Sequence, residues 1–218
     1  MSRPVFEPDF ADLPRILPIF PLPGVLLLPG GRMPLNIFEP RYVAMVRDAI
    51  AGARLIGMIQ PREQATDVGA AKVYGTGCAG RITAFNETED GRYLITLTGL
   101  IRFDVERELP PLSGYRRVVA DYTRFRRDLE TDSSRIDRMR LLEALGTYLD
   151  SAGIEGDWKA IEETADEPLV TSLAMICPFG APEKQALLEA MTLPERVATM
   201  TAIMEMAVHE PEGHSPRH

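Results

Sequence analysis

The sequence has 218 residues, a net charge of −8 at pH 7 and a pI of about 5.0. This length allows one large or two small domains, each with its own core. The acidic balance opposes long-range attraction of a polyanion, so nucleic acid is not an expected partner. No run approaches the ~18–20 apolar residues of a membrane span, and the first residues lack a signal-peptide core. We therefore expect a cytoplasmic protein without a membrane partner.

Cysteine and histidine usage restricts the possible chemistry. Cys78 and Cys177 lie far apart and outside any CxxC pair, which favours buried free thiols over a disulfide or a zinc site. All three histidines, His209, His214 and His218, lie in the last ten residues. The body of the chain therefore lacks the imidazole of Ser-His-Asp or Cys-His mechanisms. The sequence predicts a protein that is not an enzyme and has no cofactor or metal.

In chain order, residues 1–14 carry three prolines and several acids, and they predict a flexible N-terminal arm that Phe6 and Phe10 can pin to a surface. A β-rich subdomain follows over residues 15–126. Its expected strands are short and are separated by Gly and Pro, with a hairpin turn at Asp90-Gly91. They cover Ile16–Phe20, Val25–Leu28, Met33–Phe38, Leu55–Ile59, Gly77–Phe85, Tyr93–Thr98, Leu100–Val105 and Tyr115–Phe125.

One helix is expected inside the β-rich subdomain, with Pro40 at its start and Gly52 after its end. Gly77 to Gly80 are small residues, which suits close approach of neighbouring backbones. Short strands, one helix and dense Gly and Pro punctuation indicate a small barrel-like β domain.

A helical bundle subdomain is predicted over residues 127–208, and a disordered tail over 209–218. Its first helix is expected to end at Gly153, and Asp157 is positioned to cap the next. Prolines 168, 182 and 194 are placed to open three more helices. The apolar face predicted for the first helix consists of Ile136, Met139, Leu142, Leu145 and Leu149. The fold class is therefore α+β, a barrel followed by a bundle.

The apolar stretch Ile16–Tyr42 carries a specific motif, made of Phe20-Pro21-Leu22, Val25–Gly30, Pro34-Leu35, Ile37-Phe38-Glu39 and Arg41-Tyr42. This motif resembles the start of the Lon protease N-terminal, substrate-binding domain family. Leu28 departs from the family pattern, which usually has an aromatic residue at that position.

Later segments extend the resemblance to roughly residues 16–207: Gly77–Ile82, Asp90–Tyr93, Gly99–Phe103, Glu183–Leu188 and Pro194–Arg196. The resemblance implies a PUA-like pseudo-β-barrel followed by the helical subdomain of the family. Full Lon proteases add an ATPase module and a Ser–Lys protease module after this domain. No phosphate-binding G-x-x-x-x-G-K-[S/T] loop is present in the sequence, so a stand-alone form of the domain is expected.

By this resemblance, the chain is expected to be a non-catalytic protein- or peptide-binding module. Its partners would be unfolded proteins or peptide segments, and a role as an adaptor for a protease or chaperone in protein quality control is open. The alternative is binding of RNA or a modified base through the PUA-like barrel.

Three groups of residues are candidate sites. An exposed apolar groove for peptides would consist of Leu26, Leu28, Met33, Leu35, Ile37 and Phe38, each of which can equally be ordinary core. Glu39 and Arg41 bracket the expected helix start, where they either form an ion pair or cap that fixes the corner or contact a partner.

The nucleic-acid alternative rests on arginines interleaved with aromatic residues. Alternate residues of a strand point to opposite faces, so these arginines are not expected to form one patch, and a solvated edge strand is the competing interpretation. The candidates are Arg116, Arg117, Arg124 and Arg126.

Overall fold

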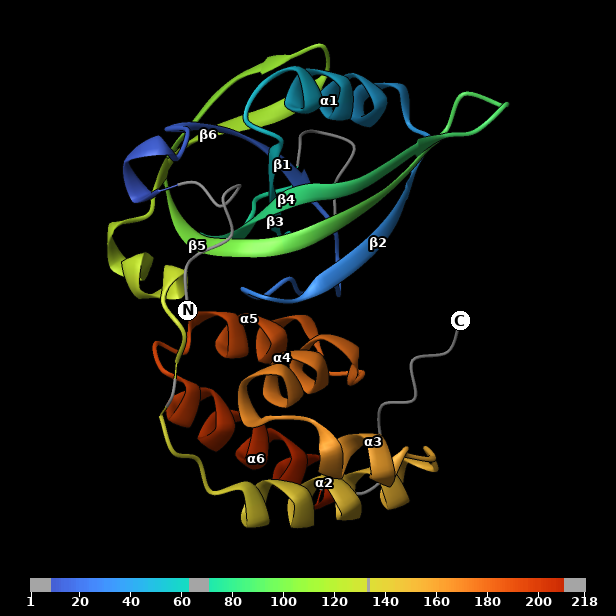
Figure 1. The fold of residues 1–218 in the computed structure, drawn as a ribbon, viewed down its shortest axis with the longest axis vertical. Coiled ribbons are helices and arrows are strands. Elements are labelled where there is room, and N and C mark those ends of the chain that lie inside the picture. Colours follow the sequence, from blue (N-terminus) through green and yellow to red (C-terminus); the bar gives the residue numbers. More distant parts are fainter. Residues whose placement is uncertain (1–8, 63–70, 133, 210–218) are drawn as a thin grey trace. The chain divides into compact units, whose positions relative to one another are not determined.

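The computed structural model describes residues 9–62, 71–132 and 134–209 (Figure 1). They fall into two compact units, one within Met1–Thr131 and the other within Asp132–His218. The boundary expected after residue 126 lies inside the 3-10 helix η2 (Thr123–Leu129) of the first unit. Most of the expected N-terminal arm and residues 210–218 of the expected tail lie outside the described residues. The described end of the arm forms the 3-10 helix η1 (Phe10–Asp12), and Phe10 packs on the core.

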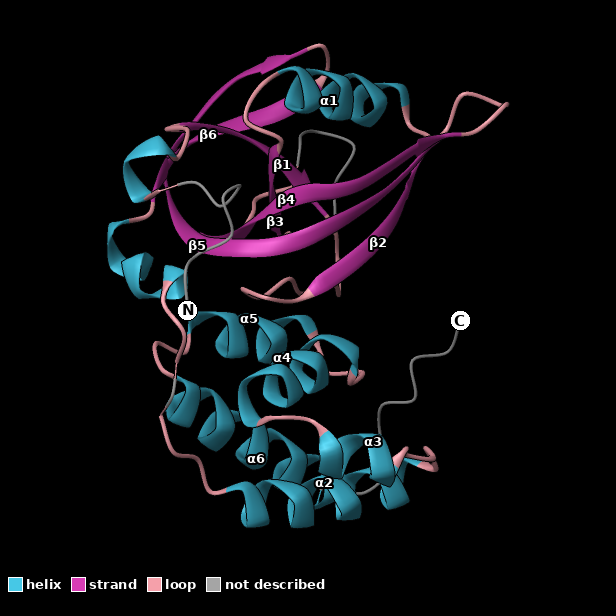
Figure 2. Ribbon diagram, viewed as in Figure 1, coloured by secondary structure: helices cyan, strands magenta, loops and turns pink. Residues whose placement is uncertain are grey.

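Within its described residues, the first unit is a barrel-like sheet with one α-helix, α1 (Pro40–Ala51) (Figure 2). The strands follow the order β2-β5-β4-β3-β1-β6, and β5 also pairs with β6, so the sheet curls round on itself. All pairings are antiparallel except that of β1 with β3. The expected α+β class is confirmed. The strands are β1 (Ile16–Pro21), β2 (Arg32–Ile37), β3 (Leu55–Ile59), β4 (Thr76–Glu87), β5 (Tyr93–Leu112) and β6 (Tyr115–Asp121).

Strand β5 is 20 residues long and pairs with different strands along its length. Its first part, 93–98, lies between β2 and the end of β4, while 104–112 pair with β6. We call the three-stranded part made by β2, residues 83–87 of β4 and residues 93–98 of β5 the sheet arm. The hairpin that joins β4 to β5 projects from the barrel at the end of this arm (Figure 1).

The barrel core requires glycine at two positions beside Phe103, which is fully buried. A Cβ on Gly57 would lie 2.8 Å from the Phe103 ring, and a Cβ on Gly77 would lie 2.6 Å from the carbonyl oxygen of Met58. Such contacts are too short for any side chain. The prediction that small residues between Gly77 and Gly80 permit close backbone approach is therefore confirmed at Gly77, and Gly57 is a further such position that was not predicted.

The strand expected at Val25–Leu28 is absent. The three leucines are buried, but the segment runs between two turns and pairs with no strand. Backbone bonds just beyond it fasten it to β5: Gly30 N–H donates to Gly99 O at 2.9 Å, and Gly99 N–H donates to Gly31 O at 2.8 Å. Burial was therefore inferred correctly, whereas the strand was wrong because an apolar run does not reveal whether its backbone joins a ladder.

A buried ion pair holds η2 against β5. Asp128 accepts from the backbone N, Nε and one terminal nitrogen of Arg102 at 2.9, 2.8 and 2.7 Å. The side chains are only 3% and 7% exposed. The Arg102 guanidinium also lies 4.5 Å from the centre of the Phe125 ring.

The second unit is a helical bundle. The predicted caps are present: Asp157 accepts from Ala160 N at 3.1 Å, and Gly153 ends α2 with φ +65°. Helix α6 includes His209, which was expected to belong to the tail. The helices are α2 (Arg138–Ala152), α3 (Trp158–Glu163), α4 (Asp166–Ile176), α5 (Ala181–Glu189) and α6 (Leu193–His209).

The buried face of α2 differs from the predicted one. Leu145 and Leu149 are buried as expected, but Met139 is 73% exposed. The apolar residues support two overlapping stripes, and the bundle buries the one that includes the aromatic ring of Tyr148. The buried residues of α2 are Leu141, Ala144, Leu145, Tyr148 and Leu149.

Two absences apply to the described part of the chain. Its helices include none with the length and apolar character that a bilayer crossing demands. Across residues 9–62, 71–132 and 134–209, no three His, Cys, Asp or Glu side chains gather into a group able to hold a metal ion.

Candidate protein-binding surface

The structure does not form the apolar groove suggested by the opening stretch. Leu26, Leu28, Met33 and Ile37 are buried, with at most 7% exposure, so the expectation that they line an exposed surface is wrong. The alternative stated for them, ordinary core, is what the burial shows. Of the six candidates only Leu35, half-buried on β2, and Phe38, 63% exposed before α1, remain accessible.

Glu39 and Arg41 form an ion pair at the entrance to α1, with Nη2 2.8 Å from Oε2. The Arg41 guanidinium also lies 4.5 Å from the centre of the Tyr42 ring, which is buried and packs at 4.2 Å on Phe20. The Glu39 side chain makes no capping bond to the helix. The pair therefore braces the corner, as the structural interpretation expected, and its two charges neutralise each other.

Each candidate arginine contacts a carboxylate, a backbone carbonyl oxygen or an aromatic ring. Arg116 pairs with Glu108 at 2.6 Å, and Arg124 pairs with Asp104 at 2.9 Å. Arg117 donates to Pro110 O, and Arg126 lies over the Phe10 ring.

The expected strand Tyr115–Phe125 stops at Asp121, because the chain turns into η2. Arg124 and Arg126 therefore belong to a 3-10 helix rather than to a strand. Arg116 and Arg117 lie on β6, so the four arginines do not share one element.

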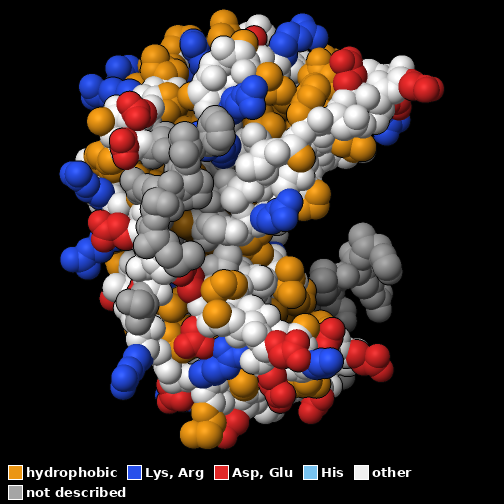
Figure 3. Space-filling view, viewed as in Figure 1, with side chains coloured by type: hydrophobic (Ala, Val, Ile, Leu, Met, Phe, Trp, Pro, Cys, Tyr) orange, Lys and Arg blue, Asp and Glu red, His pale blue; other side chains and the backbone are white. Residues whose placement is uncertain are grey.

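The sheet arm carries a shallow groove of about 510 Å³. Side chains alternate between the two faces of a strand, and residues paired across a ladder share a face. The registers then place two rows on the face opposite Ile95: Asn36, Leu94 and Asn86 form one, and Pro34, Thr96 and Ala84 form the next. Figure 3 shows apolar side chains exposed among polar ones along the projecting hairpin.

The first row has an apolar centre between two amides. Leu94 is 45% exposed, and Asn36 and Asn86 are exposed on either side of it. Neither side-chain amide has a hydrogen-bond partner in the described part of the chain. Each amide offers both a donor and an acceptor. The row can therefore contact an apolar side chain and hydrogen-bond to a backbone at the same time.

The free edge of β2 is poorly suited to pairing with another strand. Gly99 N–H donates a backbone hydrogen bond to Gly31 O. In an antiparallel ladder, hydrogen-bonded residue pairs recur at every second position. The backbone N–H and C=O groups of residues 33, 35 and 37 therefore point toward β5. Pro34 therefore faces outward, where its missing N–H interrupts the edge. Addition of a further strand at this edge is therefore disfavoured.

Sequence reasoning missed Leu94, Asn86 and Ala84. The signal was present in part, because the Asp90-Gly91 turn fixes the pairing of the two strands that it joins. The sequence pattern does not show how far this hairpin projects from the barrel. It is this projection that leaves an apolar residue such as Leu94 exposed to solvent.

The geometry defines an α+β protein with a barrel-like sheet and a helical bundle. The model of the ATP-dependent protease La (LON) substrate-binding domain matches residues 16–206. The chain belongs to this family.

Curated relatives include Lon protease 2 of Myxococcus xanthus and Lon protease of Anaeromyxobacter dehalogenans, each 28% identical over 202 residues. Each match covers 88% of this chain but only 24% and 23% of the respective relative. The chain thus spans about a quarter of the length of these proteins.

Two solved structures share the fold. The Lon N-terminal domain protein from Xanthomonas campestris is 24% identical with a TM-score of 0.60, covering 86% of this chain and 97% of that one. The N-terminal domain of the Mycobacterium avium complex Lon protease is 14% identical with a TM-score of 0.58, covering 87% and 98%. Both confirm the predicted resemblance at the level of the fold.

Proposed function

We propose that this chain is a non-catalytic substrate-recognition module that binds extended or unfolded protein segments on the face of the sheet arm. Membership of the Lon substrate-binding family supports the class of function. The proposed location of the binding site rests on one observation: Leu94 lies exposed in a row between Asn36 and Asn86.

In this proposal a bound segment lies across the arm in an extended conformation. An apolar side chain of the segment packs on Leu94, which removes apolar surface from water. The amides of Asn36 and Asn86 bond to its backbone, a feature common to all sequences, so recognition tolerates varied clients. Delivery of such segments to a protease or chaperone, the adaptor role, is the cellular context that we propose.

Binding of nucleic acid is not proposed, because the candidate arginines already contact carboxylates, carbonyls or rings.

The test compares two leucines of β5 with nearly equal exposure, Leu94 at 45% inside the groove and Leu112 at 43% outside it. Each is changed to Asp, and binding of a permanently unfolded, carboxymethylated probe protein is measured by fluorescence anisotropy. Leu94→Asp should weaken binding about tenfold or more, equivalent to about 1.4 kcal/mol. Leu112→Asp should bind as the parent does.

A folded Leu94→Asp protein with unchanged affinity would exclude the arm as the site. Equal losses in both variants would point to a general effect of added negative charge. Asn36→Ala and Asn86→Ala serve as milder changes, each removing one neutral hydrogen bond of about 0.5–1.5 kcal/mol.

A further inference from the structure

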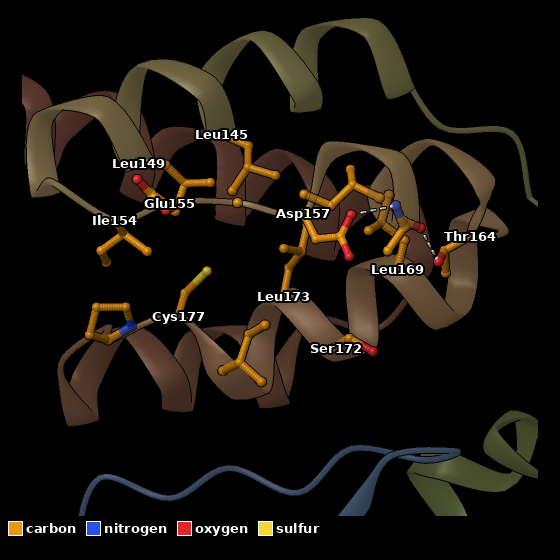
Figure 4. A pocket seen from close by; sticks show the side chains of 15 residues that line it. Leu145, Leu149, Ile154, Glu155, Asp157, Thr164, Leu169, Ser172, Leu173 and Cys177 are labelled. Atoms are coloured by element: carbon orange, nitrogen blue, oxygen red, sulfur yellow. Dashed lines mark hydrogen bonds between the residues drawn. The ribbon is translucent and has the colours of Figure 1, made fainter.

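The helical unit contains a pocket of about 380 Å³ that has no part in the proposed function. Its walls come from α2, α3, α4, the segment between α2 and α3, and the residues that directly follow α3 and α4. Figure 4 shows Leu145 and Leu149 entering from α2, opposite Leu173 and Cys177. Apolar side chains dominate, which is the usual character of sites for small molecules of this size.

The charged groups at the pocket all have one sign. Glu155 and Asp157 are its charged lining residues, and no Lys, Arg or His of the described chain lines it. Asp157 accepts from Ala160 N with one carboxylate oxygen at 3.1 Å. Both carboxylates belong to exposed residues at the rim, whereas the leucines form the interior.

Cys177 supplies a thiol to the inner wall. The residue is 4% exposed, and its sulfur points into the pocket in Figure 4. Burial raises the pKa of this thiol to about 11, although the charge of Lys184 opposes the shift. The group is therefore a neutral, polarizable surface at pH 7, and Lys184 itself does not line the pocket.

We propose that this pocket binds a small organic cation, with an aliphatic or aromatic body among the leucines and an ammonium group at the rim, which Glu155 and Asp157 make negatively charged. Burial of the hydrocarbon supplies the affinity, and the two rim carboxylates select the sign of the head group. An anion of the same shape would meet like charge at the rim. This inference does not depend on the proposed function, since it concerns residues of the other unit.

Cys177 makes occupancy measurable. The rate at which it reacts with a thiol reagent is followed by mass spectrometry in the presence of octylammonium or octanoate, which share one chain length. The reaction rate of Cys177 should fall by the factor 1 + [L]/Kd, where [L] is the free concentration of the compound. Octylammonium at ten times its Kd should therefore slow the reaction about tenfold. Octanoate should give little protection. Cys78, 1% exposed in the barrel core, reports any global change.

Two variants locate the effect. Ile176, 74% exposed, lines the pocket, and Met139, 73% exposed, does not. Ile176→Lys should abolish protection by octylammonium and favour octanoate, whereas Met139→Lys adds the same charge and should leave protection intact.

Two results would overturn the proposal: no protection of Cys177 by octylammonium, or equal protection by octylammonium and octanoate. Equal loss of protection in the two variants would also reject this pocket. Binding of the unfolded probe protein is measured in parallel, so that failure here and failure of the arm site remain distinguishable.

Discussion

Removing the carboxylate of Asp128 is expected to destabilise the barrel unit by about 3–5 kcal/mol, the cost of breaking a buried ion pair on one side. Asp128→Ala leaves Arg102 with three donor groups that lose their acceptor, at a site where both side chains are nearly inaccessible. Each unsatisfied buried donor costs about 1–3 kcal/mol, and relaxation toward water reduces their sum. Since small proteins are stable by about 5–15 kcal/mol, the loss is a large fraction of the total.

The assay is urea unfolding followed by far-ultraviolet circular dichroism, with the fluorescence of Trp158 as a second signal. Trp158 is the single tryptophan and lies in the helical unit, so it distinguishes loss of the barrel from loss of the whole protein. Glu106→Ala is the control, because it removes the partner of the exposed Arg15 at 3.3 Å and should cost less than about 1 kcal/mol. If Asp128→Ala costs no more than this control, the ion pair does not hold η2 as argued.

Three further predictions concern stability. Gly99→Ala should destabilise the barrel by more than the ~1–3 kcal/mol of ordinary overpacking, because its Cβ would lie 2.0 Å from the backbone oxygen of Leu28; a mild effect in urea unfolding would contradict this close approach. Gly146→Ala in α2 should stabilise the helical unit by about 0.5–1 kcal/mol, since the new Cβ would meet Trp158 at an ordinary 3.5 Å; Trp158 fluorescence in urea would reveal any loss instead. Burial and the bond to Asp48 raise the pKa of Tyr115 to about 12, so its contribution is present below pH 10 and is lost as the pH rises towards 12. The destabilisation caused by Tyr115→Phe should therefore shrink over that interval, and a constant difference between pH 8 and 12 would refute the assignment.

Local chemistry made several features predictable. Asp157 at a helix start, Gly153 after a helix end and glycines where strands approach closely each answer a steric or hydrogen-bonding need within a few residues. The motif between Ile16 and Tyr42 pointed to the fold in a different way, through its resemblance to the Lon substrate-binding domain family.

Exposure was harder to predict. Leu28 and Leu94 are both leucines in apolar surroundings, yet one is fully buried and the other is 45% exposed. The difference arises from how far the β4–β5 hairpin extends beyond the barrel, which depends on contacts between distant segments. The prediction that Met139 lies on the buried face of α2 was wrong for a similar reason. Two stripes on this helix are apolar, and only packing against the other helices decides which one is buried.

The long strand β5 also has a consequence for synthesis of the chain. Among the described strands, β2 pairs only with β5, so Arg32–Ile37 have no partner until Tyr93–Thr98 have been made. At about 5–20 residues per second, that interval lasts roughly 3–12 s. During it, the apolar residues between β1 and α1 leave the ribosome before the sheet can cover them. The nascent barrel therefore passes through the same unfolded, apolar condition that the finished arm is proposed to recognise in other proteins.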